Sequence, residues 1–125
     1  MRNGTLPAMD TLKIESTPGS RPGVTILRLS GPFTLSNMFD FQTLVREERP
    51  PVLLIDLAGV PYMDSAALGA VLGVHASCQR EGRKYALVAV PERIQTLLKV
   101  IGVDKMVVQY ATAADAEEHL APATA

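Results

Sequence analysis

The dipeptide Asp64-Ser65 places a carboxylate beside a hydroxyl at a point where the chain changes structure. A short apolar run at 52–55 ends in Asp56, and a loop containing Gly59 and Pro61 then leads to Asp64. Asp and Ser favour helix N-cap positions because their side-chain oxygens accept hydrogen bonds from free backbone N–H groups. The pair therefore predicts the start of a helix, and the sequence leaves open which of the two residues is the cap.

The other residues that could do chemistry are isolated. His75 and His119 have no ligand spacing around them, and Cys78 is the single cysteine. One cysteine cannot form an internal disulfide, and a thiolate metal site needs more than one. No Gly-rich phosphate loop is present, and two lone histidines do not indicate a Ser-His-Asp set. We therefore expect no catalytic residues, no metal site and no cofactor, and we expect Cys78 to be a small hydrophobe that is buried or half-buried.

Composition narrows the class of protein. The chain has 125 residues, of which 47% are hydrophobic and only 5% aromatic, so one domain with an aliphatic core is expected. The net charge is −1 without a basic run, which argues against a nucleic-acid surface. There is no run of about 18 apolar residues and no signal-peptide layout, which favours a cytoplasmic protein without a transmembrane segment. We expect one domain over 10–120 and flexible termini at 1–9 and 121–125.

Strand patterns alternate with helix patterns along this domain. Strands are predicted at 11–16, 24–29, 52–55, 85–90 and 106–108, and helices at 35–48, 65–81, 91–101 and 113–120. Gly82 and Gly102 stand where helix C-caps favour glycine. The order β-β-α-β-α-β-α-β-α predicts an α/β fold, in which an antiparallel first pair joins a mixed, mostly parallel sheet with helical cover.

Two predicted helices carry patterns with more than one interpretation. The helix at 65–81 has a stripe of small residues, which fits either close packing against the sheet or a flat docking surface for a partner; the stripe consists of Ala66, Gly69, Ala70, Gly73 and Ser77. The helix at 35–48 places Phe39 and Leu44 off its main apolar stripe. These two side chains indicate either deeper burial or a patch for self-association or a partner.

The segment after the loop also resembles a known family. It consists of Met63-Asp64-Ser65-Ala66-Ala67-Leu68-Gly69. This is similar to the Met-Asp-Ser-Ser/Thr-Gly-Leu-Gly hallmark of STAS domains, above all of the stand-alone bacterial anti-sigma factor antagonists. Gly31 and the residues at 98–102 match that family in type and place, and the resemblance extends over the element order of roughly 10–120.

The resemblance implies both a fold and a switch. In the family, a partner anti-sigma factor with serine kinase activity phosphorylates the serine after the Asp, here Ser65. The unphosphorylated antagonist binds that factor and frees the sigma factor. The resemblance thus implies a non-enzymatic binding protein whose partner surface includes Met63, Asp64, Ser65, Ala66 and Gly69, with a homodimer also open.

The sequence departs from the family pattern at two places. Ala66-Ala67 replace the second hydroxyl residue and the glycine of the hallmark, which predicts a stiffer helix start. Pro32-Phe33-Thr34 replace the usual Glu-Leu-Asp after Gly31, so an acidic residue near the partner surface is lost. Two other hypotheses stay open: a STAS subunit of a lipid-transport ATPase or a stressosome-like scaffold, without phosphorylation, and a small α/β enzyme.

Overall fold

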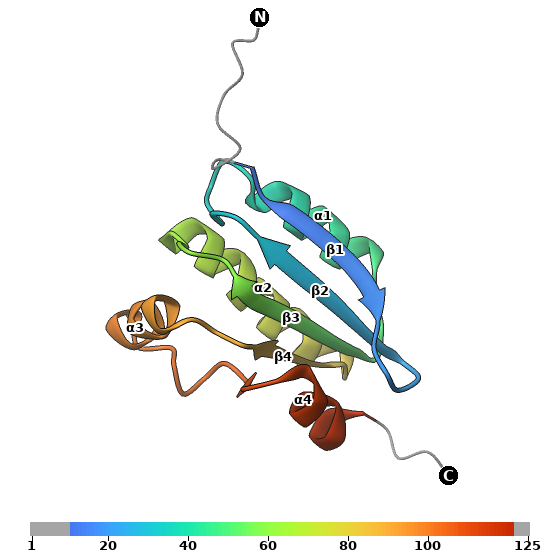
Figure 1. Cartoon of the computed structure of the whole chain (residues 1–125). Coiled ribbons are helices and arrows are strands. Elements are labelled where there is room, and N and C mark those ends of the chain that lie inside the picture. The colour runs from blue at the N-terminus through green and yellow to red at the C-terminus, as the bar shows by residue number, and fades with distance from the viewer. Residues whose placement is uncertain (1–10, 122–125) are drawn as a thin grey trace, which may run out of the picture.

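The computed structural model describes residues 11–121, which form one mixed sheet with four helices (Figure 1). The strand order is β1-β2-β3-β4-β5; β1 runs antiparallel to β2, and the other neighbours are parallel. The elements are β1 Lys13–Pro18, β2 Val24–Ser30, α1 Met38–Glu47, β3 Val52–Gly59, α2 Ser65–Glu81, β4 Lys84–Val88, α3 Glu92–Ile101, β5 Gln109–Tyr110 and α4 Ala113–Leu120. The predicted α/β fold class and element order are confirmed.

The predicted flexible termini lie almost entirely outside the described residues. Only Ala121 of the segment 121–125 is described, and its N–H donates to the Glu117 carbonyl at 2.9 Å. The domain bounds of 10–120 therefore stay a prediction. Within the described part of the chain, no helix is long and apolar enough to cross a membrane.

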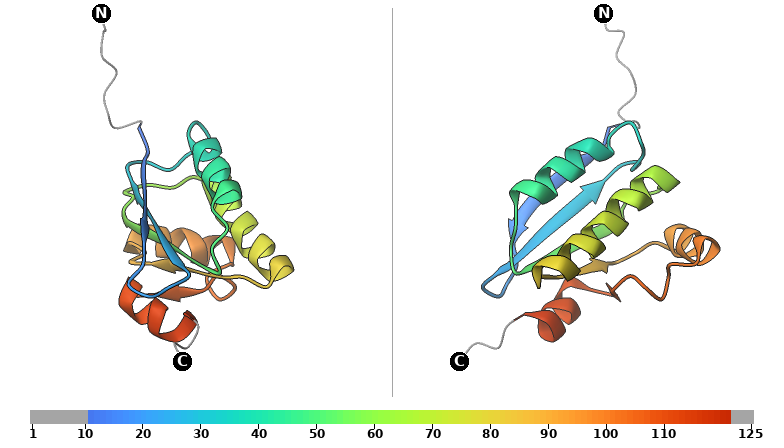
Figure 2. Two further views of the ribbon diagram at one scale, coloured as in Figure 1. Left: turned by 90° about the vertical axis from the view of Figure 1, so that its right-hand side faces the viewer. Right: turned by 180° about the vertical axis from the view of Figure 1, so that it is seen from behind.

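The sheet is covered on both faces. Helices α1, α2 and α3 pack on one face and α4 packs on the other (Figure 2). Alternation along β2 divides its side chains, because Leu27 and Leu29 point to the three-helix face whereas Val24 and Ile26 join the cluster under α4. The run 52–55 of β3 is buried throughout, as its continuous apolar sequence predicts.

Two boundaries differ from the sequence-based expectation near the start of α1 and in β3. α1 begins at Met38 rather than at Leu35, because the residues before it form a turn in which Thr34 N–H donates to Asn37 Oδ1 at 3.0 Å. Short polar side chains offer the backbone such local alternatives to a helix. β3 continues past Asp56 to Gly59, and the Asp56 carboxylate pairs with Arg28 Nε at 3.3 Å.

The last strand is also displaced. β5 comprises Gln109–Tyr110 instead of 106–108, because the Val103 carbonyl accepts from Met106 and Val107 N–H and keeps the intervening residues in a turn. The two glycine caps are confirmed, with φ of 68° at Gly82 and 87° at Gly102. Both values are in the left-handed region that glycine enters at low cost.

A buried carboxylate joins the β1–β2 hairpin to α4. Glu117 is 4% exposed, and it accepts from Arg21 N–H at 2.9 Å and from both the N–H and the hydroxyl of Ser20, at 3.2 and 3.1 Å. Burial raises the pKa of this carboxyl, but the hydrogen bonds from Arg21 and Ser20 outweigh it and leave the pKa below its ordinary value of 4.5.

We expect Glu117 to make the fold sensitive to acid. Because the folded-state pKa is lowered, its stabilising contribution is complete above about pH 4.5 and is lost as the pH falls through the lowered pKa. Glu117→Gln should reduce the free energy of unfolding at pH 7 by about 1–3 kcal/mol and flatten its dependence on acid pH. Urea unfolding between pH 3 and pH 7 measures both, and Glu118→Gln, at an exposed neighbour, is the matched control. Equal stability of the two variants at pH 7 would contradict this role.

Candidate functional site

Asp64 and Ser65 lie where the chain leaves the carboxyl end of β3 and enters α2. Asp64 has extended backbone, and its Oδ1 accepts from Ala67 N–H at 2.9 Å, so Asp64 is the N-cap of α2. Ser65 is therefore the first residue of the helix, and its side chain is exposed. Of the two candidates, Asp64 is thus the cap, and the Ser65 hydroxyl lies at the surface.

The loop before α2 is hydrogen-bonded to the loop that leaves the neighbouring strand β2. Three backbone bonds join them: Gly31 N–H to the Gly59 carbonyl at 2.9 Å, Phe33 N–H to the Tyr62 carbonyl at 2.9 Å, and Asp64 N–H to the Phe33 carbonyl at 3.2 Å. The other carboxylate oxygen of Asp64 accepts from Leu35 N–H at 3.0 Å. The residues at 31–35 and 59–64 thus form one hydrogen-bonded layer of loops beyond the carboxyl ends of β2 and β3.

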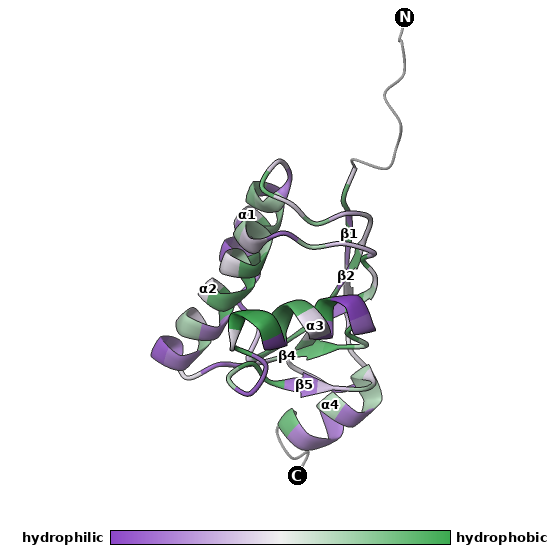
Figure 3. Ribbon diagram, turned by 90° about the vertical axis from the view of Figure 1, so that its left-hand side faces the viewer, coloured by the Kyte–Doolittle hydropathy of each residue, from purple (hydrophilic) through white to green (hydrophobic). Residues whose placement is uncertain are grey.

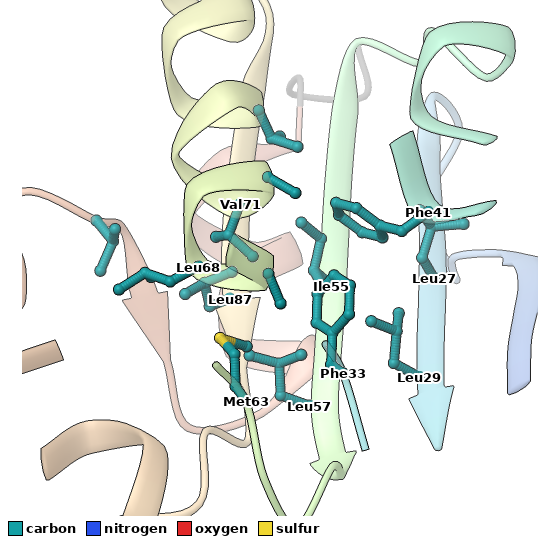
Figure 4. Packing of buried hydrophobic residues seen from close by; sticks show 14 of the residues in the cluster. Leu27, Leu29, Phe33, Phe41, Ile55, Leu57, Met63, Leu68, Val71 and Leu87 are labelled. Atoms are coloured by element: carbon teal, nitrogen blue, oxygen red, sulfur yellow. The ribbon is translucent and has the colours of Figure 1, made fainter. Parts of the chain in front are cut away.

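Two apolar side chains anchor this layer from below. Phe33 is fully buried, and its ring meets that of Phe41 edge-on with centroids 5.1 Å apart. Met63 is 5% exposed and lies with Phe33 and Leu57 in the core (Figure 4). The side chain of Met63 thus lies mostly in the core and supports the loop, and it reaches the surface only where it lines a groove beside α3. That Met63 contacts a partner stays a prediction.

The small-residue stripe of α2 has a different environment from the one expected under close packing. Gly69 and Gly73 are exposed, and a Cβ placed on either would meet no atom within 4 Å. Ala70 is buried and Ala66 is half-buried. The sheet-packing interpretation is wrong for the two glycines, so Ser65, Ala66 and Gly69 remain on a face that a partner can reach.

Exposed apolar side chains lie on the turn before α1, in α1 and on the loop before α2. Leu35, Phe39 and Tyr62 are 56%, 60% and 49% exposed. The burial interpretation for Phe39 is therefore wrong, whereas Leu44 is partly buried against the core. A groove of about 380 Å³ lies between the loop and α3, whose apolar residues are green in Figure 3. The groove is lined by Tyr62, Met63, Arg93, Ile94, Thr96, Leu97 and Val100.

The two histidines and the cysteine, which stand alone in the sequence, pack against other parts of the fold. His75 Nδ1 lies 2.8 Å from the Tyr85 hydroxyl, which also accepts from Val108 N–H at 3.2 Å. Cys78 is buried as expected, and burial raises the pKa of its thiol. His119 stacks on Tyr110 with ring centroids 5.2 Å apart. Among residues 11–121, no group of three or more His, Cys, Asp and Glu side chains could hold a metal ion.

The open space over Gly69 predicts a stabilising substitution. Alanine inside a helix is more favourable than glycine by about 0.5–1 kcal/mol, and the added methyl group would meet nothing within 4 Å. We expect Gly69→Ala to raise Tm by about 3 °C in a thermal melt.

Gly31→Ala is the opposite control for that measurement. Gly31 has φ of 107°, and a Cβ there would lie 2.3 Å from the Thr11 carbonyl oxygen. We expect Tm to fall for Gly31→Ala, because backbone atoms cannot move aside as a flexible side chain can. A lower Tm for Gly69→Ala would show that this position requires glycine and would contradict an open α2 face.

Comparison with solved structures shows where this fold recurs. An anti-sigma factor antagonist from Mycobacterium paratuberculosis is 22% identical, with 94% of this chain and 100% of that chain covered and a TM-score of 0.79. An anti-sigma-factor antagonist (STAS) domain protein from Planctomyces limnophilus is 19% identical, with 87% and 98% covered and a TM-score of 0.71. A sulfate transporter family protein from Wolinella succinogenes is 24% identical, with 71% and 78% covered and a TM-score of 0.61.

Sequence comparison gives a more specific result. Among curated proteins, no sequence matches this chain. The family model of the STAS domain matches residues 18–116, which include all of β2 to β5 and the Asp64-Ser65 site. A match over most of the chain, together with the mixed sheet and the helix that starts at Ser65, shows that this chain belongs to the STAS domain family.

Proposed function

We propose that this protein is an anti-sigma factor antagonist that acts by binding an anti-sigma factor with serine kinase activity. The observation that carries the proposal is the exposed Ser65, which opens α2 directly after its Asp64 cap and occupies the serine position of the STAS hallmark. Antagonists from two bacteria share the fold over nearly their whole length. The exposed apolar side chains of Leu35, Phe39 and Tyr62, on segments next to the α2 start and in α1, supply the kind of surface that protein partners bury.

Phosphorylation of Ser65 is the proposed switch. The kinase would transfer the γ-phosphoryl group of ATP to Ser65 Oγ, with ADP leaving and the hydroxyl proton released to a base of the kinase. The first turn of a helix carries free N–H donors and about +0.5 of effective charge, so α2 can accept the new anion without melting. The phosphate carries about −1.5 to −2 charges at pH 7. A partner that packs against the bare serine would then meet a desolvated anion, and its binding weakens.

We expect Ser65 to be the single regulatory phosphorylation site. The partner is first recovered by a pull-down from native lysate of the source bacterium and is then purified. After incubation of this protein with that partner and ATP, mass spectrometry should locate one phosphate, on Ser65. Modification of Ser65→Ala to the same extent would contradict the prediction, and a partner that binds without phosphorylating any residue would favour the alternative of a STAS subunit in another complex.

We expect Ser65→Asp to weaken partner binding by about 30-fold, or ~2 kcal/mol, while the fold persists. A carboxylate at the first position of a helix is locally favourable by about 0.3–1 kcal/mol, so Tm should change by only a few degrees. Calorimetric titration with the purified partner, run beside a thermal melt, measures both quantities.

The matched control places the same charge on α2, but far from Ser65. Ala76 is exposed and lies 11 residues after Ser65 on α2, which corresponds to roughly 16 Å along the helix axis. Ala76→Asp should leave the affinity within about twofold, because the charge is beyond a Debye length of about 8 Å. Equal losses for the two variants, or a collapse of Tm for Ser65→Asp, would refute a switch located at Ser65.

A further inference from the structure

The carboxylate of Asp64 accepts hydrogen bonds from two separate segments, the start of α2 and the turn before α1. Oδ1 accepts from Ala67 N–H at 2.9 Å and caps α2, while Oδ2 accepts from Leu35 N–H at 3.0 Å in the turn before α1. Both oxygens are therefore engaged within the chain. That Asp64 contacts a partner stays a prediction; these bonds also make it a positioning residue that fixes Leu35 at the start of α2.

Leu35 belongs to the apolar surface beside the serine. It is 56% exposed, and Phe39, four residues further on in α1, is 60% exposed. The turn that carries Leu35 is held by other hydrogen bonds that do not involve the Leu35 N–H. Asn37 Nδ2 donates to the Pro32 carbonyl at 2.8 Å, and the Thr34 carbonyl accepts from the N–H groups of Asn37 and Met38 at 3.1 and 2.9 Å. The bond to Asp64 is the one that links Leu35 itself to the start of α2.

We propose that a phosphate on Ser65 drives the Asp64 carboxylate away from Leu35 N–H and so frees Leu35 from the start of α2. The switch would then alter the Leu35–Phe39 surface as well as the serine. This inference rests on the phosphorylation of Ser65 in the proposed function, and it adds how the charge is transmitted to a neighbouring element.

The physical basis is repulsion between two anions on adjacent residues. A phosphate carries about −1.5 to −2 charges at pH 7 and would lie directly beside the Asp64 carboxylate. Like charges on neighbouring residues repel, and the repulsion falls if the Asp64 side chain turns away. Its bond to Leu35 N–H lies in an exposed part of the site, where water can replace the acceptor, so this bond is the one that breaks.

The test measures hydrogen exchange at individual backbone amides and does not require the partner protein. Phosphoserine is incorporated at position 65 during translation, and solvent exchange of amide protons is measured by NMR for the phosphorylated and unphosphorylated full chains. We expect Leu35 N–H to exchange about tenfold faster in the phosphorylated protein, which is the loss of one ordinary hydrogen bond. Asp115 N–H donates to Thr112 Oγ1 at the start of α4 and should not change, so it is the internal reference.

Asp64→Asn separates this relay from a purely structural role. Asparagine is an N-cap as good as aspartate, so α2 stays capped, but its amide has one acceptor oxygen and no charge. Leu35 N–H should therefore exchange fast in Asp64→Asn, at the same rate with or without the phosphate.

Four results would overturn the proposal. They are an unchanged Leu35 rate on phosphorylation, the same acceleration on phosphorylation in Asp64→Asn, faster exchange at Asp115 as well, and a protected Leu35 in unphosphorylated Asp64→Asn. A failure here leaves partner binding by Ser65→Asp to be judged by itself, because that titration does not depend on the Leu35 amide.

Discussion

The hydrogen bonds between the loops after β2 and β3 determine the geometry of the whole site. Parallel strands end at the same edge of a sheet, and their loops there would expose unpaired N–H and C=O groups unless these find partners. In this protein the two loops pair with one another, through Gly31 with Gly59 and Phe33 with Tyr62 and Asp64. The pairing extends the sheet by a short layer, and that layer fixes the direction in which α2 begins.

The pairing requires particular residues on the β2 side. Gly31 has φ of 107°, and the Thr11 carbonyl lies where its Cβ would be, so an L side chain would push the loop away from β1. Phe33 then fills the core beneath the layer and meets Phe41 of α1. The segment Pro32-Phe33-Thr34, which departs from the family pattern, therefore has a structural role: it buries a large ring at the centre of the loop, and the polar contacts fall to Thr34 and Asn37.

Much of this arrangement can be predicted from the sequence because the signals are local. The helix from Ser65 to Glu81 and the glycines at 82 and 102 follow from capping preferences that act within one turn, whereas the choice of Asp64 over Ser65 as the cap came from the structure. The expectations that were wrong concern contacts between elements. The spacing of small residues groups Gly69 with Ala70, but only the assembled structure decides that α2 turns Gly69 toward solvent while Ala70 is buried.

The choice of Asp64 as the cap has a consequence for a switch at Ser65. A neutral cap such as Thr112 of α4 satisfies its helix equally well through one hydroxyl, and it would not respond to a neighbouring charge. An aspartate binds two donors with separate oxygens and carries a charge that a phosphate next door must repel. Under the proposed phosphorylation of Ser65, the residue that caps α2 is thus also a charged group directly beside the new phosphate. The added charge would then act on the turn before α1, while α2 keeps the hydrogen bonds that run within the helix.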